Sequence, residues 1–220
     1  MLKKYINYLK LFYSHSLHRE LLENEIIGIA GQVRGRVLDV GSKNRRYDTT
    51  FYNAGSIIAI DINPLIKENI VKANAINIPF KSGSFDVVIS FEVFEYILNI
   101  EKVLEEIKRV IMRNGLLIFS APLLNPVHGD IDVVRYTYRG WEMILSKYFD
   151  IIELKSFGGT FTIMWDFYFE RVRNAYNNLV KLVVFPILFI AKYVAIYLDR
   201  RSQNNRFVMG YFIVCKPKEE

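Results

Sequence analysis

Short apolar runs recur through the middle of the chain, and turns or amphipathic segments separate them. These runs lack polar alternation, which is typical of strands that are covered on both faces of a parallel sheet. An amphipathic segment, Ile100–Met112, precedes the last run and predicts a helix. Strands that alternate with helices at this spacing predict an α/β fold. The predicted strands are Arg36–Val40, Ser56–Ile60, Phe85–Ser90 and Leu116–Ala121.

Helical patterns precede these strands, and further strands follow them. Residues 2–13 have the pattern of a basic amphipathic helix, and a second helix is predicted from about Leu17 to Ile29. Toward the other end of the chain, Tyr148–Lys155 and Phe207–Val214 resemble two more strands.

The chain has 220 residues, of which 51% are hydrophobic. This length suits one α/β domain with a full core and is short for two domains. We therefore expect a single domain over residues 1–220. Within it we expect a helical N-terminal extension over residues 1–35 and an apolar helical insert over residues 160–205, before the last strand.

The most apolar part of the insert lies within Leu179–Leu198: Leu182–Ala191 carries no charge, and Lys192 is the only charge from there to Leu198. Lys181, Lys192 and Asp199 fall within about 20° of one stripe of a helix, which leaves a broad apolar face. The stretch is short for a spanning helix, which needs roughly 20 apolar residues, and Pro186 would kink it. Two interpretations remain open. The helix lies in a membrane interface between flanking arginines, or it packs over the sheet edge or in a dimer interface.

Charge and composition limit the kinds of partner and of site that the chain can have. The net charge of +6 is concentrated at the ends: residues 1–36 carry +3, residues 37–160 carry −1 and residues 161–220 carry +4. Such basic ends suit a nucleic acid or an anionic membrane. A single cysteine, Cys215, excludes an intramolecular disulfide and any multi-cysteine metal site, and we predict no metal. The first residues show no secretory pattern, so we expect a cytoplasmic protein, at most peripheral to the membrane.

Two acidic residues mark the ends of the first two predicted strands. Asp39 and Gly41 end the first strand, and Asp61 ends the second, 22 residues after Asp39. An acidic side chain about 20 residues beyond a glycine turn is placed to accept hydrogen bonds from a ribose. The alternative role for Asp61 is to cap a following helix.

Five segments together resemble class I S-adenosylmethionine-dependent methyltransferases, in their small-molecule, type 11-like branch. The resemblance covers about half of the chain, in the family's order and spacing. It implies a Rossmann-like sheet of seven strands, mostly parallel with an antiparallel last strand and helices on both faces, and S-adenosylmethionine as cofactor. The matching segments read VLDVGS (37–42), IIAIDI (57–62), ANAINIPFKSGSFDVVISFEVFEYI (73–97), LEEIKRVIMRNGLLIFSAP (104–122) and HGDIDVVRYT (128–137).

The resemblance also implies roles for individual residues. Asp39, Gly41 and Ser42 would lie beside the methionine part of the cofactor, which Ser90 would touch through its backbone. Asp61 would bind the ribose. Ile62 would pack against the adenine, and Asn74 and Ala75 would lie along the edge of the adenine.

The chain departs from the family at several positions. Lys43 and Arg45 occupy the two further glycine positions of the first turn, and we expect these larger residues to avoid a positive φ there. Asn74 replaces the usual aspartate, and Tyr96 replaces the histidine often found after the glutamate at Glu95.

Catalytic candidates come from the segment after the fifth strand, which would overhang the site. Methyl transfer mainly needs alignment of the acceptor and sometimes removal of a proton. His128 is a candidate general base, Arg135 could hold a carboxylate or phosphate of the acceptor, and Tyr136 lies beside it. The alternative for Arg135 is an ion pair with Asp132 that orders the loop.

Taken together, the sequence predicts a methyltransferase that acts on a small-molecule or lipid/glycan-linked acceptor, with membrane contact or a homodimer as further possibilities. A nucleic-acid substrate is disfavoured, because Ser90-Phe91-Glu92-Val93 replaces the Asn/Asp-Pro-Pro-aromatic turn of amino-methylating nucleic-acid enzymes. Two alternatives stay open. One is an inactive binding protein in which Lys43 and Arg45 block the cofactor, and the other is an RNA methyltransferase.

Overall fold

The computed structural model describes residues 12–65, 69–127, 132–175, 177–202 and 206–219. The chain divides into two compact units. Unit 1 comprises residues 1–24, 124–126 and 156–210, and unit 2 comprises residues 25–123, 127–155 and 211–220. The basic helix predicted within residues 2–13 falls almost wholly outside the described residues.

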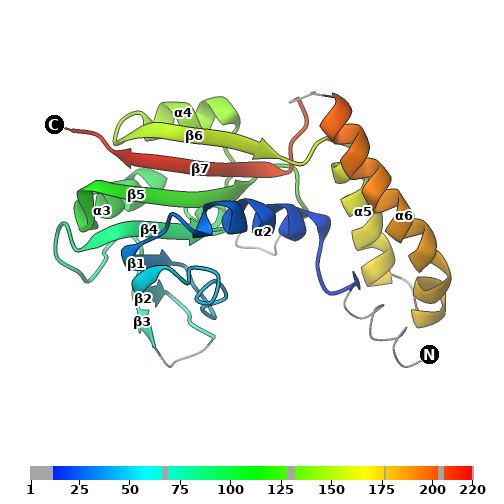
Figure 1. Ribbon diagram of the computed structural model, residues 1–220, viewed down its shortest axis with the longest axis horizontal. Coiled ribbons are helices and arrows are strands. Elements are labelled where there is room, and N and C mark those ends of the chain that lie inside the picture. The colour runs from blue at the N-terminus through cyan, green and yellow to red at the C-terminus, as the bar shows by residue number, and fades with distance from the viewer. Residues whose placement is uncertain (1–11, 66–68, 128–131, 176, 203–205, 220) are drawn as a thin grey trace. The chain divides into compact units, whose positions relative to one another are not determined.

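A seven-stranded sheet of order β3-β2-β1-β4-β5-β7-β6 forms the centre of unit 2 (Figure 1). β1 pairs in parallel with β2 and β4, and β2–β3 and β4–β5 are also parallel. β7 runs antiparallel to its two neighbours, as the arrows in Figure 1 show. The predicted fold class is therefore confirmed. The strands are β1 (Gly35–Val40), β2 (Ala54–Asp61), β3 (Ile70–Lys72), β4 (Phe85–Phe91), β5 (Ile111–Pro122), β6 (Phe149–Phe157) and β7 (Gly210–Pro217).

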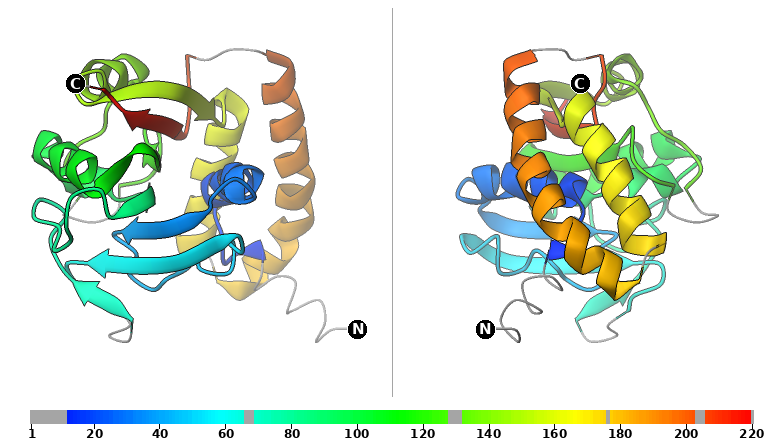
Figure 2. Two further views of the ribbon diagram at one scale, coloured as in Figure 1. Left: turned by 60° about the vertical axis from the view of Figure 1, so that its left-hand side comes forward. Right: turned by 90° about the vertical axis from the view of Figure 1, so that its right-hand side faces the viewer.

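Helices cover both faces of this sheet (Figures 1 and 2). α3 (Ile100–Val110) and α4 (Tyr138–Leu145) lie on one face, and the part of α2 (Leu17–Ala30) that belongs to unit 2 lies on the other. α3 begins where the Asn99 side chain accepts the Lys102 N–H at 3.3 Å. Its apolar residues are buried at helical spacing, so the strands are covered as their unbroken apolar runs predict.

Unit 1 is built around two antiparallel helices, α5 (Thr160–Ala175) and α6 (Asn178–Ser202) (Figure 2). The indole N–H of Trp165 on α5 donates to the Leu188 carbonyl of α6 at 2.9 Å. The buried Asp166 carboxylate accepts the Leu17 N–H at 2.7 Å and so caps α2. We call α5 and α6 together the hairpin. It occupies the position of the expected apolar insert.

The sequence predicted most elements but not their ends. β5 starts at Ile111 rather than Leu116, and the preceding helix ends at Val110 rather than Met112. The sequence pattern did not reveal the three-residue β3, which is too short to show a period, or α4. α6 continues through Pro186 without a break.

Candidate functional site

The turn after β1, residues 41–45, lies where the topology of the sheet switches. β2 and β4 flank β1 on opposite sides, so the connections leave β1 in opposite directions. Ligands of open parallel sheets bind beyond the carboxyl ends of the strands at such a point. The predicted residues Asp39, Gly41, Ser42 and Asp61 all lie at this edge, at the ends of β1 and β2.

Alternate residues of this turn have a left-handed backbone: φ is +77° at Gly41, 52° at Lys43 and 54° at Arg45. The expectation that Lys43 and Arg45 avoid a positive φ is therefore wrong. Lys43 and Arg45 thus adopt a backbone that glycine adopts without strain, at a cost of about 1–2 kcal/mol per residue. At Gly41 a side chain is excluded outright, because a Cβ would lie 2.4 Å from a methyl carbon of Val93. Such strain is characteristic of functional sites.

The side chain of Arg45 is held by hydrogen bonds to three acceptors. Its guanidinium donates to the Asp48 carboxylate and the Asn69 carbonyl, each at 2.5 Å, and to the Ile57 carbonyl at 3.2 Å. These three acceptors hold the guanidinium against β2 and the start of β3. Lys43 is exposed. The contacts of Arg45 offset part of the strain in its backbone and occupy its guanidinium, whose charge still lowers the pKa of Asp39.

Asp61 fixes the turn from the end of β2. Its carboxylate accepts the Lys43 N–H at 2.9 Å and the Asn63 N–H at 2.7 Å, one on each oxygen. The Gly41 and Ser42 N–H groups donate to the Ile60 carbonyl at 2.9 and 3.2 Å. Each carboxylate oxygen has a second lone pair, so Asp61 can hold the turn and still accept a ribose hydroxyl.

Asp39 is a buried carboxyl group beneath the turn. Burial raises its pKa to about 7, and the negative charges of Asp48 and Asp61 add to this effect. A hydrogen bond with Ser42 acts in the opposite direction. A cation placed beside Asp39 would favour its ionised form, which suits the ammonium group of the predicted cofactor.

The remaining predicted cofactor residues lie around the same edge. Ile62 is 56% exposed directly beyond β2, as a platform for a flat ring would be. The Asn74 side chain accepts the Ile76 N–H at 3.2 Å, which shapes the turn, and Ala75 is half-buried. Ser90 is buried and its hydroxyl donates to the Val40 carbonyl at 3.1 Å, so the hydroxyl serves the sheet; the contact between the Ser90 backbone and the cofactor stays a prediction.

Two glutamates after β4 have environments that the sequence analysis missed. Glu92 has a φ of 56°, and its carboxylate and N–H both bond the Ser120 hydroxyl, at 2.8 and 3.1 Å. Glu95, in the 3₁₀ helix η1 (Phe94–Tyr96), is buried, and its carboxyl has no hydrogen-bond partner among the described residues. Burial and the neighbouring Glu92 raise the pKa of Glu95 to about 9, so it is neutral at pH 7. A glutamate inside the apolar run VFEYIL was the available signal.

The predicted catalytic residues lie on the segment after β5. Arg135 forms the ion pair with Asp132 and also donates to the Leu123 carbonyl at 2.8 Å, so it ties this segment to the end of β5. The Val133 N–H donates to the Glu95 carbonyl at 2.9 Å, and the ring of Tyr136 packs on Trp141. His128 lies outside the described residues. The catalytic roles of His128, Arg135 and Tyr136 stay predictions.

The described part of the chain holds no group of three or more His, Cys, Asp or Glu residues that could bind a metal ion. Three features of the turn support its fit to the predicted cofactor. The turn has a glycine-type backbone, the cation of Arg45 is bound elsewhere, and Asp39 and Asp61 are the acidic groups at the strand ends.

Part of the chain matches a known family model. Residues 38–119 match the family model described as "Methyltransferase domain". The chain is 31% identical over 123 residues to an uncharacterised protein of Methanocaldococcus jannaschii, MJ1252, a match that covers 54% of the chain. The chain thus spans about half (47%) of the length of this curated relative.

Solved structures share the fold at low sequence identity. The YcgJ protein of Bacillus subtilis has a TM-score of 0.58 at 14% identity, over 90% of this chain and 99% of that one. Phosphoethanolamine N-methyltransferase 2 of Haemonchus contortus, solved with S-adenosyl-L-methionine, has a TM-score of 0.56 at 14% identity, over 89% of this chain and 53% of that one. Identities this low show the fold alone.

Proposed function

We propose that the protein transfers a methyl group from S-adenosylmethionine to a small-molecule or lipid-linked acceptor, because residues 38–119 match the family model described as "Methyltransferase domain". The observation that carries the proposal is the backbone of residues 41–45. It keeps the glycine conformation at Lys43 and Arg45 although neither residue favours it.

Different residues of the site would bind different parts of the cofactor. S-adenosylmethionine supplies a methyl group on a sulfonium, which is already a good leaving group. Asp39 would accept a hydrogen bond from the cofactor's ammonium, Asp61 would accept hydrogen bonds from the ribose hydroxyls and Ile62 would pack on the adenine. The protein then mainly has to align the acceptor and hold water away from it.

The segment between β5 and α4 is proposed to form the acceptor side. In the described residues it carries Asp132, Arg135 and Tyr136, and the internal bonds of Arg135 hold it against the end of β5. His128, which belongs to the same segment of the sequence, is the proposed general base. A small or lipid-linked acceptor suits a cytoplasmic protein that works in solution or at a membrane surface.

An inactive binding protein is the second candidate, because charged residues fill the glycine positions 43 and 45. The anchoring of Arg45 by Asp48, Asn69 and Ile57 favours the enzyme over this candidate. An RNA methyltransferase is the third, supported by the basic ends of the chain.

The test is transfer of label from methyl-tritiated S-adenosylmethionine into soluble and membrane extracts of the source cells. We expect label in organic-soluble or small polar products, and an at least tenfold loss with Asp61→Asn. Asp86→Asn is the matched control, because the Asp86 carboxylate also accepts a backbone N–H, that of Arg36 at 2.8 Å, but at the start of β4. Label in RNA, or no label from folded protein, would refute the proposal.

A further inference from the structure

The charged stripe of α6 faces protein, not water. Lys192, midway along the helix, is only 8% exposed, and its ammonium pairs with the Glu20 carboxylate of α2. Asp199 accepts the Phe161 N–H at 3.0 Å and the Thr162 N–H at 2.8 Å, so it caps α5. These charged residues therefore stabilise unit 1 from within.

The opposite face of α6 is apolar and exposed. Between residues 182 and 198 no exposed side chain is charged, and tyrosine hydroxyls are its only polar groups. A surface helix of a soluble protein has the reverse arrangement, with apolar residues inward. We call these exposed residues the outer face: Val183, Pro186, Ile187, Phe189, Ile190, Tyr193, Val194, Tyr197 and Leu198.

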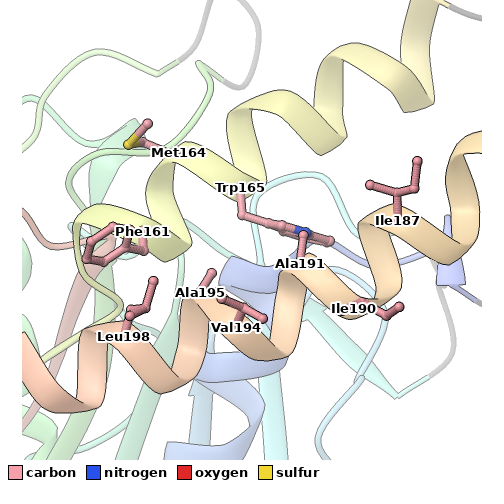
Figure 3. A pocket seen from close by; sticks show the side chains of 9 residues that line it. All are labelled: Phe161, Met164, Trp165, Ile187, Ile190, Ala191, Val194, Ala195 and Leu198. Atoms are coloured by element: carbon pink, nitrogen blue, oxygen red, sulfur yellow. The ribbon is translucent and has the colours of Figure 1, made fainter.

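α5 continues this surface. Its exposed residues over its first ten positions are Phe161, Met164, Phe167 and Tyr168. Between the helices lies an open groove of ≈ 540 Å³, which nine nonpolar side chains line (Figure 3). Met164, Ile187 and Ile190 on its rim are each more than 60% exposed. An apolar patch of this extent marks an interaction site.

α6 is also long and apolar enough to cross a membrane. It has 25 residues, and its most apolar 18-residue window has a mean hydropathy of 2.2. The pair between Lys192 and Glu20 argues against a crossing. It lies at the middle of α6, where a span would carry it into the centre of the bilayer at high cost. A helix in the plane of the membrane keeps this pair on its protein side.

We propose that the hairpin docks on an anionic lipid bilayer, with α6 lying in the membrane plane and its outer face in the acyl region. Basic side chains border the apolar surface where headgroups would lie: Arg200 and Arg201 are exposed in the last turn of α6, and Arg171 is exposed on α5. The exposed Tyr193 and Tyr197 suit the headgroup boundary. A second protein copy fits less well, because protein interfaces carry about one hydrogen bond per 100–200 Å² and the outer face has few groups to form them.

The experiment is flotation of the purified full chain with preformed vesicles, either of phosphatidylcholine or of phosphatidylcholine mixed with phosphatidylglycerol. We expect binding to the mixed vesicles and an at least tenfold weaker binding for Ile187→Glu and Ile190→Glu. Ile27→Glu is the matched control, because Ile27 is equally exposed (63%) on helix α2, outside the hairpin. Arg200→Ala with Arg201→Ala is expected to remove the preference for anionic lipid.

Vesicle binding does not require the cofactor, so this test is independent of the proposed function. Equal binding by Ile187→Glu and the unsubstituted chain would overturn the docking surface. A dimer in light scattering that the same substitutions dissociate, without vesicle binding, would assign the face to a second copy instead. Retention in vesicles after an alkaline carbonate wash would overturn the in-plane arrangement in favour of a span.

Discussion

Lys43 and Arg45 show how charged residues can occupy glycine positions without closing a site. Both have a left-handed backbone, but only Arg45 gains side-chain contacts that offset the strain. Lys43 is exposed. The strain at Lys43 is offset by backbone hydrogen bonds alone, from its N–H to the Asp61 carboxylate and from the Leu65 N–H to its carbonyl, which indicates that the turn conformation itself is what the protein requires.

This difference predicts opposite effects of the same substitution. Lys43→Gly relieves the strain and is expected to raise the free energy of unfolding by about 0.5–1 kcal/mol. Arg45→Gly also relieves strain, but it leaves the Asp48 carboxylate without the guanidinium and is expected to lower that free energy by about 1–3 kcal/mol. Urea denaturation measures both. A loss of stability in both variants would contradict this account of the turn.

Asp39 is expected to make cofactor binding depend on pH. Its pKa is raised to about 7 in the free protein, so at pH 6 most molecules carry the neutral acid, which the cofactor's ammonium does not favour. Affinity for S-adenosylhomocysteine should therefore rise about tenfold from pH 6 to pH 8, as the ionised fraction of Asp39 grows. Calorimetry in buffers of different ionisation enthalpy should detect proton release on binding.

Asp39→Asn provides the control for this prediction. The amide does not titrate, so the affinity of the variant should be weaker but nearly constant between pH 6 and pH 8. A flat profile for the unsubstituted protein would show that Asp39 does not face the ammonium.

The residues of the site were accessible to sequence reasoning only in part. The interval between Asp39 and Asp61 and the glycine at position 41 identified the turn, because this chemistry depends on residue type and spacing. The positive φ values at Arg45 and Glu92 occur beside contacts with residues distant in the chain, Asn69 and Ser120. A local sequence pattern does not reveal such long-range contacts.

At the scale of elements, buried strands and amphipathic helices were predictable because each has its own hydrophobic period. β3 is too short for a period, and the start of β5 depends on its pairing of Ile111 with Phe85 of β4. The sequence also showed that the charged residues of α6 lie on one stripe of the helix. It did not show whether this stripe faces the protein or the solvent. Lys192 and Asp199 face inward because Glu20 and the start of α5 provide their partners.

Asp199 offers a test of this inward arrangement. Asp199→Ala removes the acceptor of the Phe161 and Thr162 N–H groups and is expected to destabilise the hairpin by about 1–2 kcal/mol. Native-state hydrogen exchange should then be faster at these amides, while amides of β1 and β4 keep their protection. Unchanged exchange at Thr162 would contradict the capping role.

At the scale of the whole molecule, the chain joins two units with different chemistry. Unit 2 carries the sheet, the strained turn and residues 38–119, which match the family model described as "Methyltransferase domain". Unit 1 carries the hairpin, which presents an uncharged surface with basic residues at its border. The proposed methyl transfer and the proposed lipid docking therefore assign one role to each unit.

The most direct test of the central claim is calorimetric titration with S-adenosylhomocysteine. We predict micromolar binding to the folded protein, an at least tenfold loss with Asp61→Asn and no loss with Asp86→Asn. Absence of binding by the folded chain, or equal binding by the Asp61 variant, would contradict the assignment of the turn after β1 as the cofactor site.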